Sequence, residues 1–121
     1  TKDNIININN LKEKIYQTQF VENKNRFPKP NITSYSLNKG EKVVLCLYDY
    51  RNEEFYDLNT LIFVSIHELA HIANPTIGHD ESFYYIFNIL LNQAIFLKIY
   101  TFYNYEKIPK KYCGIIINSN I

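Results

Sequence analysis

Apolar positions recur at helical spacing near the start of the chain. Residues three or four apart lie on one face of a helix, and this set is Ile5, Ile8, Leu11 and Ile15. The spacing predicts an amphipathic helix that continues to about Asn23. The next segment, residues 25–31, carries two prolines and is expected to form a loop.

Patterning of the β type follows. Residues 32–37 alternate weakly between apolar and polar, and residues 43–50 are strongly β-prone. The turn-forming sequence Asn38-Lys39-Gly40 stands between them. The pattern predicts a β-hairpin, followed by a polar connection over residues 51–56.

The next segment is apolar on nearly every side. It covers residues 58–73, begins after the favourable N-cap residue Asp57 and stops before Pro75. A helix without a polar face is expected to be buried. The sequence therefore predicts a central helix in this place.

A second long helix is predicted after a short loop over residues 74–78. Asp80 can cap this helix, and the apolar pattern continues to about residue 103. Pro109 ends the helical region, and residues 113–117 predict a last short strand.

The chain has 121 residues, of which 46% are hydrophobic and 16% aromatic. These values predict a single domain over residues 1–121 with its own core. The fold class predicted is α+β, with a small β-sheet beside a buried helix and a second long helix. The net charge of +1 gives no reason to expect nucleic acid or an anionic membrane as partner. Three lysines cluster late in the chain and are expected to lie in a solvated turn: Lys107, Lys110 and Lys111.

The two cysteines, Cys46 and Cys113, are too few to form a disulfide framework in a domain that can build its own core. We expect free thiols in a reducing compartment. The sequence contains no recognisable signal peptide or membrane-spanning stretch. The first residue is Thr1 rather than Met, which leaves open whether an anchor or domain precedes it.

The candidate chemistry is concentrated in one segment. His67 and His71 stand one helical turn apart, so both imidazoles can reach a single zinc ion at about 2.0–2.1 Å. Glu68 is placed to accept a proton from a zinc-activated water without binding the metal itself. Buried imidazoles on so apolar a helix would be costly without a partner, which argues against ordinary core histidines.

A third ligand after the helix would leave the fourth coordination position open, as in catalytic zinc sites. Gly78 permits a sharp turn that would return His79 to the metal. Asp80 and Glu81 are alternative third ligands, because carboxylates also bind zinc. The remaining alternative for His79 is a surface position at the start of a helix.

Tyr112 and Cys113 are a second point of interest. A tyrosine near zinc can stabilise a developing oxyanion, and a cysteine can bind the metal. Because nothing in the sequence places this pair near the metal, we favour the interpretation that both residues fill the core beside the last strand.

These residues resemble the WLM (Wss1-like) zinc metallopeptidases. The resemblance covers roughly residues 32–121, and a branch encoded by large DNA viruses is most similar. It rests on the following pieces: residues 67–71, Gly78-His79-Asp80, Phe83, Thr33-Ser34-Tyr35, residues 38–42 and Tyr112-Cys113-Gly114.

The resemblance implies a zincin-like fold with an edge strand that holds an extended peptide. It also implies three zinc ligands, His67, His71 and His79, and Glu68 as the general base. The cellular members cleave proteins crosslinked to DNA. This sequence has seven residues between His71 and His79, more than those members typically have, and lacks their recognisable DNA-binding and partner-binding extensions.

The leading hypothesis is a zinc-dependent peptidase that acts on a protein or peptide. In this hypothesis zinc, together with Tyr112 or another tyrosine, holds the oxyanion, and residues 43–50 pair with substrate if they form an edge strand. One alternative is a catalytically silent, zinc-stabilised interaction or virion module. Another is a DNA-associated protease. The expected location is the inside of a host cell or the virion.

Overall fold

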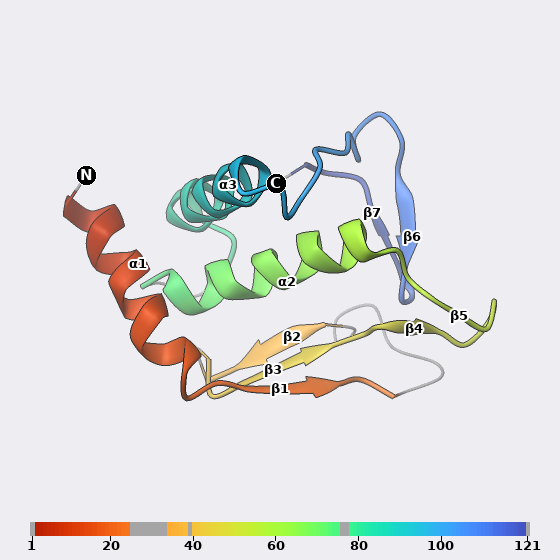
Figure 1. The fold of residues 1–121 in the computed structure, drawn as a ribbon, viewed down its shortest axis with the longest axis horizontal. Helices are drawn as coiled ribbons and strands as arrows, with labels where there is room; N and C mark the ends of the chain where they lie inside the picture. Colours follow the sequence, from red (N-terminus) through yellow and green to blue (C-terminus); the bar gives the residue numbers. More distant parts are fainter. Residues whose placement is uncertain (1, 25–33, 39, 76–77, 121) are drawn as a thin grey trace.

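The computed structural model describes residues 2–24, 34–38, 40–75 and 78–120. The helices in this part of the chain are α1 (Lys2–Ile15), α2 (Leu58–Ala73) and α3 (Glu81–Phe96). The strands are β1 (Gln19–Glu22), β2 (Tyr35–Leu37), β3 (Lys42–Leu45), β4 (Tyr48–Asp49), β5 (Glu54–Phe55), β6 (Lys110–Tyr112) and β7 (Ile115–Ile117). Figure 1 shows α2 between the three-stranded sheet and α3, with the β6–β7 hairpin near one end.

The central strand of that sheet is β3. Strand β1 runs parallel to it on one side, and β2 runs antiparallel to it on the other. The predicted hairpin is therefore confirmed between β2 and β3. Of its predicted residues, Ile32, Thr33 and Lys39 lie outside the described part of the chain.

The prediction of one strand over residues 43–50 is wrong, and the edge position that substrate pairing would have required there is not found. Strand β3 is central and stops at Leu45. The backbone N–H of Cys46 donates to Ser34 Oγ at 2.9 Å, so it does not continue the ladder. The chain resumes as β4, which pairs with β5 inside the segment predicted to be a polar connection.

The first helix ends at Ile15 rather than near Asn23, which also corrects the prediction. The Thr18 hydroxyl donates to the Lys14 carbonyl oxygen at 2.9 Å, just past the last turn. Residues of β1 then pair with β3 in parallel. The helical spacing of apolar residues itself ends at Ile15, and the residues beyond it pair as a strand instead of extending the helix. The predicted loop over residues 25–31 lies outside the described residues.

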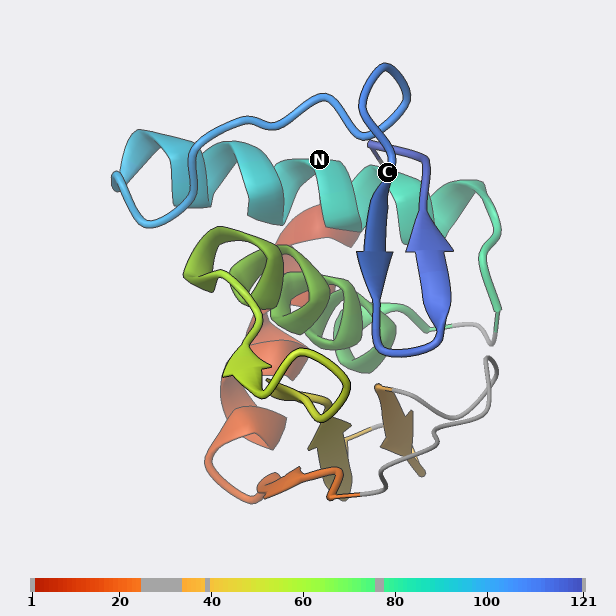
Figure 2. The same ribbon diagram turned by 90° about the vertical axis from the view of Figure 1, so that its right-hand side faces the viewer.

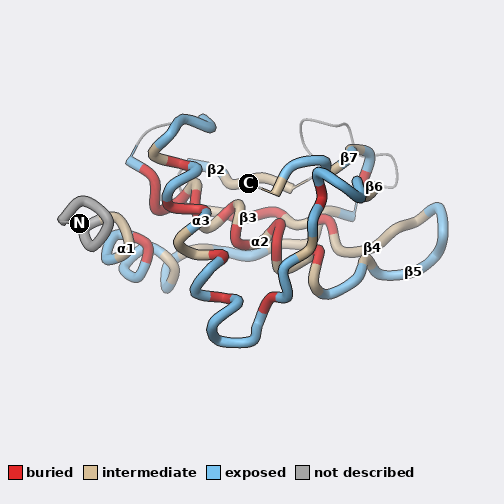
Figure 3. Tube along the Cα trace, turned by 90° about the horizontal axis from the view of Figure 1, so that it is seen from above, coloured by how far each residue is buried: buried red, intermediate tan, exposed pale blue. Residues whose placement is uncertain are grey.

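The central helix is confirmed with the predicted bounds. Asp57 accepts a hydrogen bond from the Thr60 backbone N–H at 2.9 Å and so caps α2. Buried positions run along most of the helix (Figure 3). Its last turn contacts the sheet, because a Cβ atom on Gly40 would lie 2.9 Å from Ile72 Cγ2. This close contact leaves no room for a side chain at position 40. The backbone φ of +107° at Gly40 is also one that residues with a side chain rarely adopt.

The second long helix ends at Phe96, so the prediction of a helix to residue 103 is wrong. Lys98 takes a left-handed φ of 60°, and the chain turns back on α3. This reversal buries Tyr100 and Tyr105, whose rings lie 6.1 and 4.7 Å from the ring of Phe63 on α2. Aromatic burial against α2 therefore overrides the continuing apolar pattern.

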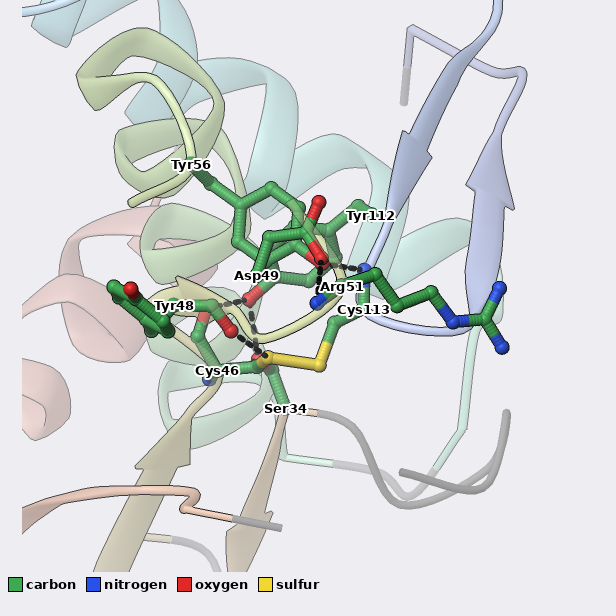
Figure 4. Close-up of a disulfide and its surroundings, with 8 residues drawn as sticks. All are labelled: Ser34, Cys46, Tyr48, Asp49, Arg51, Tyr56, Tyr112 and Cys113. Carbon is green, nitrogen blue, oxygen red and sulfur yellow. Dashed lines mark hydrogen bonds between the residues drawn. A yellow bond between two sulfur atoms is a disulfide. The ribbon is translucent and has the colours of Figure 1, made fainter. Parts of the chain in front are cut away.

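The C-terminal hairpin is tied to the sheet by a disulfide between Cys46 and Cys113 (Figure 4). The prediction of two free thiols is therefore wrong. Cys113 and Gly114 take left-handed φ values of 47° and 84°, so they form the turn between β6 and β7. The predicted last strand accordingly begins at Ile115.

Of the clustered lysines, Lys107 is exposed in a turn, as predicted, whereas Lys111 is exposed but lies in strand β6, so the predicted turn does not extend to it. Lys110 differs, because its ammonium group forms an ion pair with Asp57 at the start of α2. Within the described residues, no helix is both long enough and apolar enough to cross a membrane.

Candidate metal centre

Three imidazoles meet between α2 and the start of α3. His67 and His71 project from consecutive turns of α2, and His79 comes from the loop just before α3. Their Nε2 atoms are 3.2 Å (His67–His71), 3.0 Å (His71–His79) and 3.2 Å (His67–His79) apart. Among the described residues, these side chains form the one group that could hold a metal ion.

This spacing fits a tetrahedral zinc site. Nitrogen ligands at 2.0–2.1 Å from a tetrahedral zinc ion stand about 3.3 Å from one another. Ring nitrogens this close repel one another unless a proton or a cation lies between them. Three imidazoles also leave a fourth position for water or substrate, which is the donor set of catalytic rather than structural zinc sites.

A buried phenylalanine orients all three rings. Phe83 on α3 is fully buried, and its ring stacks on His71 with centroids 4.3 Å apart. The same ring lies 5.0 Å from that of His67 and 4.8 Å from that of His79. Packing of this kind restricts the rotamers of the ligands before a metal arrives.

Burial sets the protonation of the two central groups. It lowers the pKa of His67 to about 3, with a further contribution from the neighbouring His71 and His79, so the imidazole is neutral and able to bind a metal. Burial raises the pKa of the Glu68 carboxyl to about 8. A divalent cation held beside Glu68 would favour its ionised form.

Asp80 is an N-cap of α3 in this structure. Its Oδ1 accepts a hydrogen bond from the Phe83 backbone N–H at 2.9 Å and another from Asn74 Nδ2 at 3.3 Å. Neither Asp80 nor Glu81 belongs to the three-histidine group. Gly78, with φ of +95°, makes the sharp turn that the sequence predicts, although Thr76 and Ile77 of the predicted loop lie outside the described residues.

Asn74 connects the two ends of the loop that carries His79. It is buried after the last turn of α2, and its Oδ1 accepts a hydrogen bond from Ser82 Oγ at 2.7 Å. Its amide also reaches Asp80, so one side chain fixes the end of α2 to the start of α3. No motif or spacing in the sequence singles out this residue.

We expect Asn74→Ala to lower the free energy of unfolding by about 1–3 kcal/mol, because buried polar partners lose their hydrogen bonds. It should also weaken zinc binding by about 10- to 100-fold, the usual effect of freeing a metal ligand from its support. Competition with a chelator of known affinity measures the second effect.

Asn59→Ala is the matched control. Asn59 is half-buried, and its side chain likewise bridges two segments through hydrogen bonds with the Thr101 backbone, away from the histidines. Zinc affinity should be unchanged in this variant. Equal losses of zinc affinity in both variants would mean that Asn74 has no special role at the metal centre.

Tyr112 is nearly fully buried, as the core interpretation expects, and it also lines the same pocket as the metal centre. Its hydroxyl donates to the Cys46 carbonyl oxygen at 2.6 Å and lies 2.7 Å from Ser34 Oγ. Burial raises the pKa of this phenol to about 12, so it is a neutral donor. Cys113 is excluded as a metal ligand by its bond to Cys46.

A pocket of about 400 Å³ opens at the metal centre. His67, Glu68 and His79 are among its lining residues. The other lining residues are Ser34, Phe63, Val64, Tyr84, Tyr112 and residues 115–119. Phe63 and Val64 were detectable in principle, since each stands one helical turn before a site residue. The residues of β7 line the pocket only because the C-terminal hairpin folds back over α2, and no local sequence pattern predicts this contact.

We expect the chain, stripped by a chelator and titrated with zinc, to bind one ion. His71→Ala and His79→Ala should each weaken binding by more than about 100-fold, since loss of a ligand exceeds loss of its support. Glu81→Ala should bind as tightly as the unchanged chain. Tight binding by His79→Ala together with loss in Glu81→Ala would instead assign the third ligand to the carboxylate.

Comparison with known proteins identifies one matching family and several viral relatives. The sequence model of the WLM domain matches residues 8–113. An uncharacterized protein of Acanthamoeba polyphaga mimivirus is 37% identical over 94 residues, which is 78% of this chain and 48% of that protein. An uncharacterized protein of Invertebrate iridescent virus 3 is 49% identical over 63 residues, 51% of this chain and 38% of that protein. The chain thus spans less than half the length of these relatives.

The fold is similar to that of Wss1 from Saccharomyces cerevisiae. One Wss1 crystal structure has a TM-score of 0.56 at 24% identity, covering 65% of this chain and 59% of that chain. A crystal structure of a Wss1 mutant has a TM-score of 0.58 at 21% identity, covering 80% of this chain and 82% of that chain. The predicted zincin-like α+β fold is therefore confirmed.

Proposed function

This chain belongs to the WLM family of zinc metallopeptidase-type domains, and from that premise we propose that it is a zinc-dependent peptidase. The observation that carries the proposal is the convergence of three Nε2 atoms within 3.2 Å of one another, beside a buried carboxylate. His67, His71 and His79 would hold the ion. Glu68 would be the general base.

The chemistry divides between the ion and the chain. Zinc supplies a Lewis acid that lowers the pKa of water toward about 7 and polarises a carbonyl group. Glu68 accepts the proton of the attacking water on its carboxylate and then donates it to the leaving amine. Burial of this carboxylate excludes bulk water, which would otherwise compete for the same proton.

An extended substrate fits the free edge of β2. Among the described residues, β2 pairs with β3 on one side and with no strand on the other. Ser34, which precedes β2, lines the pocket. A peptide that adds a strand here would have its backbone fixed by main-chain hydrogen bonds as it passes the metal. This role replaces the one expected for residues 43–50.

Digestion of an unfolded protein by the zinc-loaded chain tests the proposal, with new peptide termini identified by mass spectrometry. Cleavage that stops with a chelator and returns with zinc supports it. A parallel reaction with single-stranded DNA tests the association with DNA, because stimulation that fades with salt would indicate contact with the phosphate backbone.

The second candidate is a zinc-stabilised interaction module without turnover. The observation in its favour is that the histidines join α2 to the segment before α3, so a metal there would also stabilise the fold. Zinc-dependent folding without cleavage of any substrate would favour this candidate.

We propose the virion as the location. The viral relatives suggest a host cell or virion. The Cys46–Cys113 disulfide favours the virion, because disulfides persist on virion surfaces and are rare in a reducing cytosol.

A further inference from the structure

We infer that β7 forms one wall of a subsite that selects a large apolar side chain next to the scissile bond. The inference rests on the proposed function and deepens it, because it names the class of peptide that the site accepts. Three features carry it: the surface of α2 beside the metal centre, the placement of β7 opposite that surface, and the charges around the pocket.

The surface of α2 beside the histidines is apolar. Phe63 stands one turn before His67, and Val64 stands one turn before Glu68, so both lie on the same side of the helix as the site residues. Both line the pocket. A side chain that leaves the scissile bond toward the start of α2 therefore meets hydrocarbon.

Strand β7 provides the opposite wall. Ile115, Ile116 and Ile117 all line the pocket. Ile115 and Ile117 pack against the core, whereas Ile116 remains 59% exposed. Figure 2 shows the β6–β7 hairpin alongside α2 with its turn toward the sheet, where the Cys46–Cys113 disulfide holds it. The wall is therefore fixed in place before substrate binds.

The charges around the pocket disfavour acidic and basic side chains of the substrate. Among the lining residues that the structure describes, Glu68 is the one carboxylate, and none is a lysine or arginine. An acidic substrate side chain would be buried beside Glu68 without a counter-ion. A basic one would approach the ion held by the histidines and occupy the carboxylate that the reaction needs. A volume of about 400 Å³ is ample for a large apolar side chain.

Peptide hydroxamates, whose end group binds zinc, test the subsite without requiring turnover. Calorimetric titration of the zinc-loaded chain should find the leucine-type compound about 10- to 100-fold tighter than the alanine-type compound, from the extra apolar contact. The aspartate-type compound should bind more weakly than either. Equal affinities for the three compounds would overturn the inference.

A charge placed on the wall provides a matched comparison. Ile116→Glu should lower the affinity for the leucine-type compound and raise it for a lysine-type compound. Ile108→Glu is the control, since Ile108 is 57% exposed and is not among the residues that line the pocket. The inference fails if the two variants behave alike.

Cleavage of a peptide library separates this inference from the proposed function. Cleavage without a preference for large apolar residues at one side of the broken bond would overturn the subsite and leave the peptidase. A leucine preference in hydroxamate binding, with no peptide cleaved, would overturn the peptidase and leave the subsite.

Discussion

Replacing Glu68 by Gln is expected to slow peptide cleavage by about 10²- to 10⁴-fold, the contribution typical of a general acid–base group. Glutamine has the same shape but cannot accept the water's proton. The three imidazoles that would hold zinc are unchanged, so the variant should bind one ion as tightly as the unchanged chain. The rate is measured on an unfolded protein with matched zinc content.

Glu81→Gln is the matched control for this variant. Glu81 is an exposed carboxylate in the first turn of α3. It follows His79 by two positions in the sequence. Its loss should leave the cleavage rate unchanged. Full activity in Glu68→Gln would contradict the proposed role of this carboxylate, whatever the behaviour of the control.

Removing the disulfide is expected to lower the free energy of unfolding by roughly 4 kcal/mol, the value for a bridge that closes a loop of this length. Cys46 and Cys113 are 67 positions apart, so the bridge removes much conformational freedom from the unfolded chain. Denaturant unfolding of the Cys46→Ser/Cys113→Ser double variant measures the effect.

The reductant response checks that the effect comes from the bridge. Reduction should destabilise the unchanged chain to about the level of the double variant, and the double variant should not respond to reductant. Two titratable thiols in the native, unreduced protein would contradict the observed pairing of Cys46 with Cys113.

Features with local signals could be predicted from the sequence. The helix over residues 58–73 was recoverable because a cap at Asp57, apolar residues on every side and Pro75 all agree. The grouping of the three histidines, which could hold a metal ion, followed from a spacing of one helical turn and from Gly78, whose left-handed conformation the structure contains. These signals depend on residues that are neighbours in the chain.

Features that depend on distant contacts could not be predicted in the same way. Strand β1 forms because it pairs with β3, and the sequence of residues 19–22 contains no signal that predicts this pairing. The end of α3 is decided by Tyr100 and Tyr105 packing on Phe63. The disulfide and the pocket wall at β7 both require a hairpin from the end of the chain to reach the sheet.

The rate of cleavage measured against bound zinc, from none to one ion per chain, tests the central claim most directly. The account predicts no cleavage in the zinc-free chain and a rate that rises in proportion to bound zinc until one ion is held. Cleavage that does not depend on zinc, or no cleavage of any unfolded protein by chains that each hold one ion, would contradict it.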